Sequence, residues 1–187
     1  MLGLTTPLTG RPISPAFAAL LALHVAAGLT CVITGAVALL SKKRRGRHPR
    51  YGEVYYWALG VVFVTATGMA VLHWPQNAYL FVLGSVAFAL GSLGYAARKR
   101  RWRGWLTLHI AGMSGSYVVL LTAFYVDNGP HLPVWQRLPA IAFWVGPSAI
   151  GLPLIAWTLR RRTRPLADIR ASVRALTAAP APSGLSE

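Results

Sequence analysis

Five long apolar segments make up most of this 187-residue chain, and no Lys, Arg, Asp or Glu lies in any of them. A helix needs about 20 mostly apolar residues to cross a bilayer, and each segment comes close to that length or exceeds it. The sequence therefore predicts an all-α fold. We expect an integral membrane bundle of five transmembrane helices over residues 16–40, 54–74, 79–97, 105–126 and 138–159.

The basic residues lie between these segments and indicate the direction of each helix. Six Lys or Arg residues fall in residues 41–50, five in 98–103 and six in 160–174, whereas only Arg11 and Arg137 lie elsewhere. Positive charge concentrates on the cytoplasmic side of membrane proteins. We therefore expect the N-terminus outside and the C-terminus in the cytoplasm, in a membrane of the bacterial inner-membrane type.

The net charge of +15 is also compatible with nucleic-acid binding, but the clusters flank apolar segments, so no nucleic-acid partner is expected. At the cytoplasmic face they predict attraction to anionic lipid head groups. Residues 1–15 form an expected extracytoplasmic segment, residues 16–160 the membrane domain and residues 161–187 a basic tail. Within that tail, Pro165 to Leu176 has the spacing of a short amphipathic helix, and residues 177–187 have a composition typical of disorder.

Small residues recur at helical spacing inside three of the segments. Such stripes let transmembrane helices approach closely, so they predict helix packing, either within the chain or against a homo-oligomer or membrane-protein partner. The stripes include Gly28 and Gly35 in the first segment, Gly84, Gly91 and Gly94 in the third, and Gly112 and Ser116 in the fourth.

Two histidines, His24 and His109, lie well inside apolar segments, whereas His73 lies at the outer edge of the second segment. An ionisable residue within a span is a candidate functional residue, although a hydrogen-bonded neutral imidazole is a structural alternative. Haem b needs two axial ligands at a similar depth. An outer pair of His24 with His73 or an inner pair of His48 with His109 meets that condition only if a helix boundary shifts.

A proton relay is a further alternative, with His24, Glu53 and His109 as candidate groups. Glu53 precedes the second segment, where a carboxylate at a helix start is also stabilised by the helix dipole. The chain has four acidic residues and one cysteine, and it lacks an H-E-x-x-H motif, so we predict neither a catalytic residue nor a protein-ligated metal site.

Several short motifs resemble one family of bacterial membrane proteins. They combine the two intramembrane histidines with His48, a pair of tyrosines and a Met-x-Gly-Ser-Tyr sequence. The chain thus resembles the predicted membrane proteins of domain of unknown function 2306 (DUF2306), a resemblance that implies a multi-span fold and carries no established activity. The matching residues are Leu21, His24, Gly28, His48, Gly52, Tyr55, Tyr56, His109, Met113 to Tyr117, Thr122 to Phe124, Leu132, Pro133, Trp144 and Pro147.

Three functions fit the sequence. It favours a multi-pass membrane protein without catalysis, acting as a partner or assembly protein, because it shows small-residue stripes and no soluble domain. The first alternative is a haem b electron-transfer protein that uses the intramembrane histidines, and the second is a small-molecule or proton transporter. An odd number of helices argues against the inverted repeat that many transporters contain.

Overall fold

The computed structural model describes residues 14–178 except 43–45, 73, 76 and 134, with side chains described as far as residue 162. The elements are α1 (Pro15–Leu40), α2 (Arg47–Leu72), α3 (Ala78–Arg100), α4 (Trp105–Asn128), the short 3-10 helix η1 (Gly129–His131) and α5 (Ala140–Ala178). No strand occurs among these residues. Each of the five α-helices contains a stretch long and apolar enough to span a membrane. The predicted all-α, five-helix membrane fold is confirmed, and the protein is a multi-pass membrane protein.

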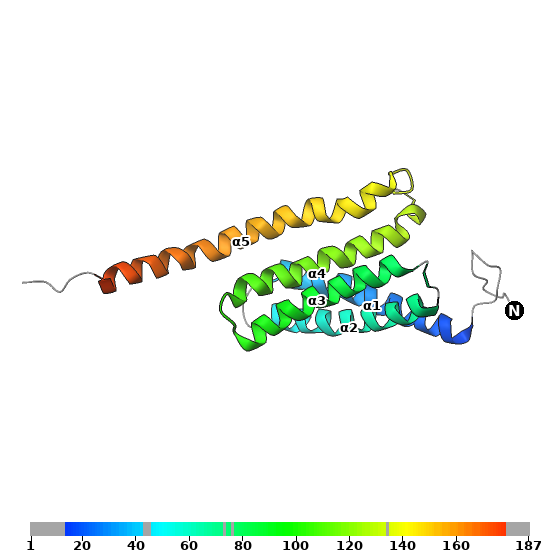
Figure 1. Cartoon of the computed structure of the whole chain (residues 1–187), viewed down its shortest axis with the longest axis horizontal. Helices are drawn as coiled ribbons and strands as arrows, with labels where there is room; N and C mark the ends of the chain where they lie inside the picture. Colours follow the sequence, from blue (N-terminus) through cyan, green and yellow to red (C-terminus); the bar gives the residue numbers. More distant parts are fainter. Residues whose placement is uncertain (1–13, 43–45, 73, 76, 134, 179–187) are drawn as a thin grey trace, which may run out of the picture.

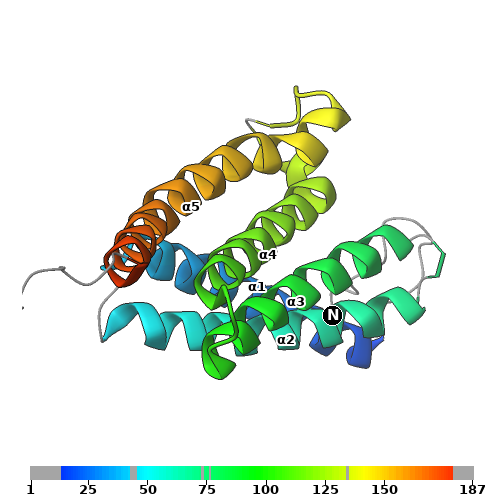
Figure 2. The same cartoon turned by 60° about the vertical axis from the view of Figure 1, so that its left-hand side comes forward.

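The helices form a four-helix bundle with a fifth helix set apart (Figures 1 and 2). In the bundle, α1 packs on α2, α2 on α3, and α3 on α4, while α1 and α4 touch more lightly. Helix α5 packs on α4, and both views show it diverging from the other three helices. Its face is mostly exposed, since Phe143 is the only buried residue among its described side chains.

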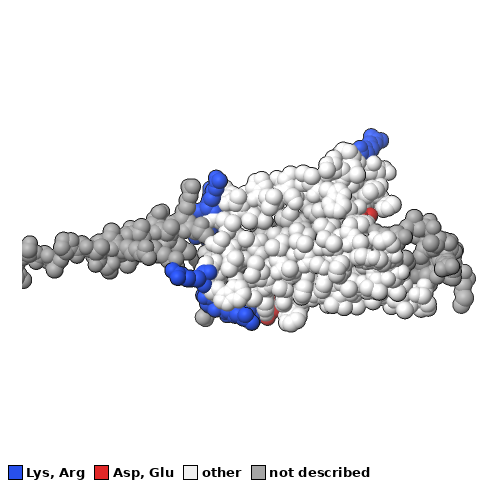
Figure 3. Space-filling view, in the orientation of Figure 1, with Lys and Arg blue, Asp and Glu red and all other residues white. Residues whose placement is uncertain are grey.

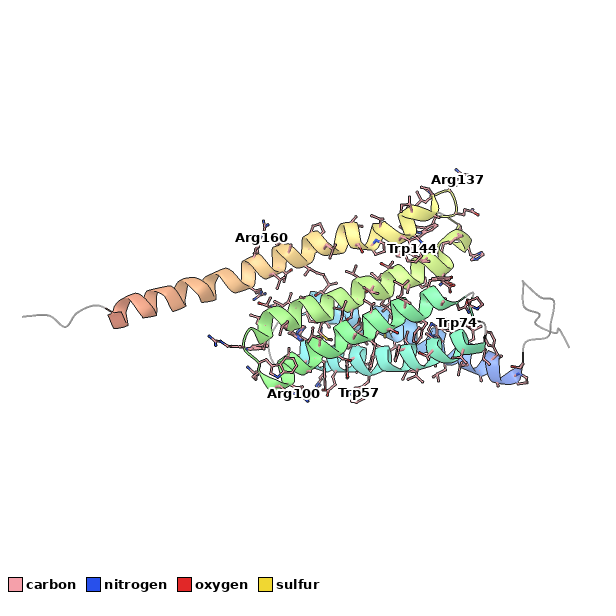
Figure 4. All side chains as sticks on the ribbon, viewed as in Figure 1. Trp57, Trp74, Arg100, Arg137, Trp144 and Arg160 are labelled. Carbon is pink, nitrogen blue, oxygen red and sulfur yellow. The ribbon has the colours of Figure 1, made fainter. Side chains whose placement is uncertain are left out.

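Charge distinguishes the two ends of the bundle (Figure 3). Lys and Arg side chains gather at one end, which we call the basic end, and Figure 4 places Arg100 and Arg160 there and Arg137 at the opposite end. That arrangement is the one the sequence predicts, because consecutive helices reverse direction. The assignment of the basic end to the cytoplasm stays a prediction.

The second helix begins earlier than the sequence predicts. It starts at Arg47 instead of residue 54, with the amide of Arg50 bonded to the carbonyl of Gly46 at 3.4 Å. Hydropathy marks only the part of a helix that lies in lipid, whereas charged residues extend a helix readily beyond it. Pro49 is compatible with this start because the first-turn amides have no partner within the helix. His48 and Glu53 are therefore helical residues of α2.

The last helix is longer than predicted. It continues through Pro165 to Ala178, so the predicted short amphipathic helix is the final part of α5. From Arg162 to Ala178 it extends about 24 Å at 1.5 Å per residue. The predicted disordered segment from 179 onwards and the N-terminal segment up to residue 13 lie outside the described residues.

Candidate functional site

The structure brings two of the predicted histidines into contact at the basic end of the bundle. The ring centroids of His48 and His109 are 6.2 Å apart, and the ring planes are nearly perpendicular at 88°. His48 is the second residue of α2 and His109 the fifth of α4, and both helices run away from the basic end. The early start of α2 therefore supplies the boundary shift that an inner histidine pair requires.

Each ring is held by a backbone carbonyl. His48 Nδ1 lies 2.8 Å from the carbonyl oxygen of Ala38, and His109 Nδ1 lies 3.0 Å from that of Gly94. A carbonyl only accepts hydrogen bonds, so Nδ1 donates in both cases, and in the neutral imidazole the lone pair is on Nε2. Histidines that ligate metals generally donate their other ring N–H to a carbonyl or carboxylate in this way.

The carbonyl contact of His109 depends on the close approach of α3 and α4. A Cβ atom on Gly112 would lie 2.7 Å from the carbonyl oxygen of Leu90 and 2.8 Å from Cα of Gly94, which are backbone atoms. Only glycines at both positions permit this approach, as the predicted small-residue stripes imply. Gly28, by contrast, has nothing within 4 Å of an added Cβ, so it makes no close helix contact within the chain, and its packing against a partner stays a prediction.

A second polar contact lies deeper in the bundle. The hydroxyls of Tyr55 and Ser116 are 2.9 Å apart, and both residues are buried. Tyr55 follows His48 by seven residues, and Ser116 follows His109 by seven, so each pair occupies one face of its helix at a two-turn spacing. We call the contact of His48 with His109 and the contact of Tyr55 with Ser116 the polar rungs. Tyr55 and Ser116 were not predicted to pair, although their shared seven-residue offset from two histidines is a signal in the sequence for such a pair.

Helix α1 closes the same interior. Tyr117 donates to the carbonyl of Val32 at 3.0 Å, and the thiol of Cys31 lies 3.8 Å from the carbonyl oxygen of Tyr55. Gly35 makes this possible because an added Cβ there would overlap the ring of Tyr117. The contact between Tyr55 and Ser116 is thus enclosed by helix backbone and by the side chains of α1 and α4.

His24 lies in the other half of the membrane domain. Its Nδ1 is 2.9 Å from the hydroxyl of Thr65. Thr65 lies 2.8 Å from the carbonyl of Val61 and 3.0 Å from that of Val62, and it donates its one hydrogen to these backbone acceptors. His24 is therefore the donor to Thr65. Asp127, at the end of α4, lies near enough to His24 for the two charges to interact.

Glu53 is separated from the histidines. It accepts a hydrogen bond from Tyr95 at 3.0 Å and forms an ion pair with Lys99 at 3.6 Å, with both charged side chains about half-exposed. Five residues separate it from His48, which places the two about 140° apart around α2. The three candidate relay residues, His24, Glu53 and His109, therefore lie in three different places.

One remaining candidate, His73, lies outside the described residues, so the outer pair of His24 with His73 stays a prediction. Among the residues described, no group of three His, Cys, Asp or Glu side chains is placed to hold a metal ion. In the same part of the chain, every buried side-chain nitrogen and oxygen has a hydrogen-bond partner.

Comparisons with protein-family models, with curated proteins and with solved structures give no match to this chain. The resemblance to domain of unknown function 2306 stays a prediction.

Proposed function

We propose that this multi-pass protein binds haem b through His48 and His109 and transfers electrons at the basic end of the bundle. The observation that supports the proposal is the contact between these two rings, which come from two different helices at one depth. The sequence predicts different depths for these two histidines unless a helix boundary shifts, and that difference argued against haem. With the early start of α2, the difference is absent for His48 and His109.

His48 and His109 would hold the iron through Nε2, because Nδ1 of each ring donates to a backbone carbonyl. The two rings lie close together, with their centroids 6.2 Å apart. The bonds from Nδ1 to the carbonyls of Ala38 and Gly94 would fix the ring orientation and increase the basicity of the ligands.

The packing around the pair restricts how a planar group enters. The backbone contact of Gly94 with Gly112 closes the α3–α4 side. Both rings are only partly buried and lie at the basic end, so a porphyrin would reach them from that surface. Bound haem iron exchanges single electrons, and the chain supplies the ligands and their orientation.

A second candidate function is the one that the sequence favours, a non-catalytic membrane partner or assembly protein in the bacterial inner membrane. The observation in its favour is that His24, His48 and His109 all have hydrogen-bond partners within the bundle. Such bonds explain neutral structural histidines without a ligand. A transporter is less well supported, because the candidate relay residues His24, Glu53 and His109 lie apart from one another.

An absorption spectrum tests the proposal. The full chain is expressed with supplementary haem, purified in detergent, and measured oxidised and after reduction with dithionite. We expect a Soret band with sharp reduced α and β bands, lost in His48→Ala and in His109→Ala but retained in His24→Ala. His24 also hydrogen-bonds within the bundle, so its variant controls for general destabilisation. A haem-free wild-type spectrum contradicts the proposal and leaves the partner function.

A further inference from the structure

We propose that the groove between α4 and α5 binds a single anionic phospholipid, with its acyl chains along the groove and its head group at the basic end. This inference concerns a different face of the molecule from the histidine pair and does not depend on the haem proposal. It also goes beyond a general attraction of basic loops to anionic membranes, because it assigns one site with its own residues.

The groove lies between α5, α4 and the inner part of α1, because α5 packs on α4 but not closely on α1. An added Cβ on Gly151 would overlap Val118, and one on Gly129 would meet the ring of Phe143. Beside these contacts the helices separate and leave a cavity of about 630 Å³, which the inner part of α1 also borders. Figures 1 and 2 show the divergence of α5 from the bundle.

The lining of the groove is apolar. Leu39 and Leu40 contribute from α1, Leu121 from α4, and Ile150 and Leu154 from α5. Two of the lining hydroxyls are engaged with backbone, since Tyr117 donates to Val32 and Thr158 to Leu154. A groove of this chemistry in a membrane is filled by hydrocarbon, since it offers little to a polar ligand.

The volume favours acyl chains over a helix. Lining residues of α5 run from Ala142 to Thr158, a length of about 24 Å at 1.5 Å per residue. A helix about 10 Å across and of that length occupies roughly 1,900 Å³, three times the volume of the groove. Flexible hydrocarbon chains fit such a narrow space.

Charge at one end of the groove indicates the head group. Lys42 follows the lining residue Leu40 by two positions, and Arg162 follows the lining residue Thr158 by four, which places it on the same face of α5 one turn further on. Both Lys42 and Arg162 are exposed. Basic pockets between transmembrane helices are typical sites for anionic lipid head groups.

Native mass spectrometry of the full chain tests the site. The protein is held in detergent that contains phosphatidylglycerol and phosphatidylcholine of equal chain length, and it is then released from the detergent in the spectrometer. Gly146→Leu fills the groove, because Gly146 lines it and nothing lies within 4 Å of an added Cβ. Gly28→Leu is the matched control, since that position is equally open but lies outside the groove. We expect one retained phosphatidylglycerol in the wild type and in Gly28→Leu, and its loss in Gly146→Leu.

A second pair of variants tests the head group. Lys42→Gln with Arg162→Gln removes two charges, which should weaken retention of phosphatidylglycerol roughly 30-fold. Arg98→Gln with Arg100→Gln is the control, because α3 contributes no lining residue. Equal retention of the two lipids overturns the anionic assignment. If Gly146→Leu retains phosphatidylglycerol as the wild type does, the proposed site is wrong. The site is also wrong if the wild type forms a dimer that Gly146→Leu abolishes, since a second copy of the chain would then occupy the groove.

Discussion

The α1–α4 bundle and the seam between α4 and α5 are held together by different means. Inside the bundle, glycine contacts bring backbones together and the polar rungs join opposite helices. At the seam, the close contacts of Gly151 and Gly129 meet side chains, and an apolar groove remains beside them. Because lipid is as apolar as leucine, burial of apolar surface does not drive helices together in a membrane. Tight packing and hydrogen bonds therefore decide which helices form one unit, and α5 has less of both.

The largest expected effect comes from filling the α3–α4 contact. Gly112→Leu places a side chain against the backbone of Leu90 and Gly94, which cannot move without separating the helices. We expect the free energy of unfolding to fall by about 3 kcal/mol or more, measured by denaturation in mixed micelles. Gly28→Leu, at an open position, should leave it nearly unchanged. Equal losses in both variants would show that the contact is not the basis of bundle stability.

The equivalent change at the seam should cost less. Gly151→Leu overlaps the side chain of Val118, and α5 can tilt away to relieve the overlap. We expect a loss of about 1–2 kcal/mol, with the bundle of α1–α4 still intact. Spin labels on the exposed residues Leu93 of α3 and Leu152 of α5 should report a longer distance in this variant. A loss as large as that of Gly112→Leu would mean that the seam is part of the same rigid unit.

Removal of one polar rung should have a moderate effect. Tyr55→Phe deletes the hydroxyl that pairs with Ser116 but keeps the ring, and Ser116 retains its bond to the carbonyl of Met113. Hydrogen bonds between transmembrane helices contribute about 1 kcal/mol, so we expect a loss of that size in the same denaturation experiment. A double-mutant cycle with Ser116→Ala isolates the contact. A coupling energy near zero would show that the rung contributes packing alone.

The smallest effect is expected at the exposed ion pair. Glu53→Gln removes the charge that faces Lys99, while the amide oxygen can still accept from Tyr95. Exposed ion pairs contribute little in high-dielectric surroundings, so we expect no measurable change in the free energy of unfolding. A clear loss would assign Glu53 a larger role than its position suggests.

The sequence predicts the helices better than their arrangement. Apolar length and the positions of Lys and Arg suffice to identify all five spans, because lipid imposes both. The start of α2 was missed since hydropathy does not report the part of a helix outside lipid, and this placed His48 in a loop. His48 and His109 were both candidates, but their contact depends on packing between distant segments. The divergence of α5 has no local signal in the sequence, because it depends on α5 packing extensively on α4 and much less on α1–α3.

The seven-residue offset between the polar rungs also restricts how the helices can move along one another. His48 and Tyr55 on α2 meet His109 and Ser116 on α4 at two levels about 10.5 Å apart. A slide of α4 by a single turn would separate both contacts together, so the axial register of α2 and α4 is held at two levels at once. Helix α5 has no comparable polar contact with α4 among its described side chains, and translation along its own axis meets resistance from packing alone.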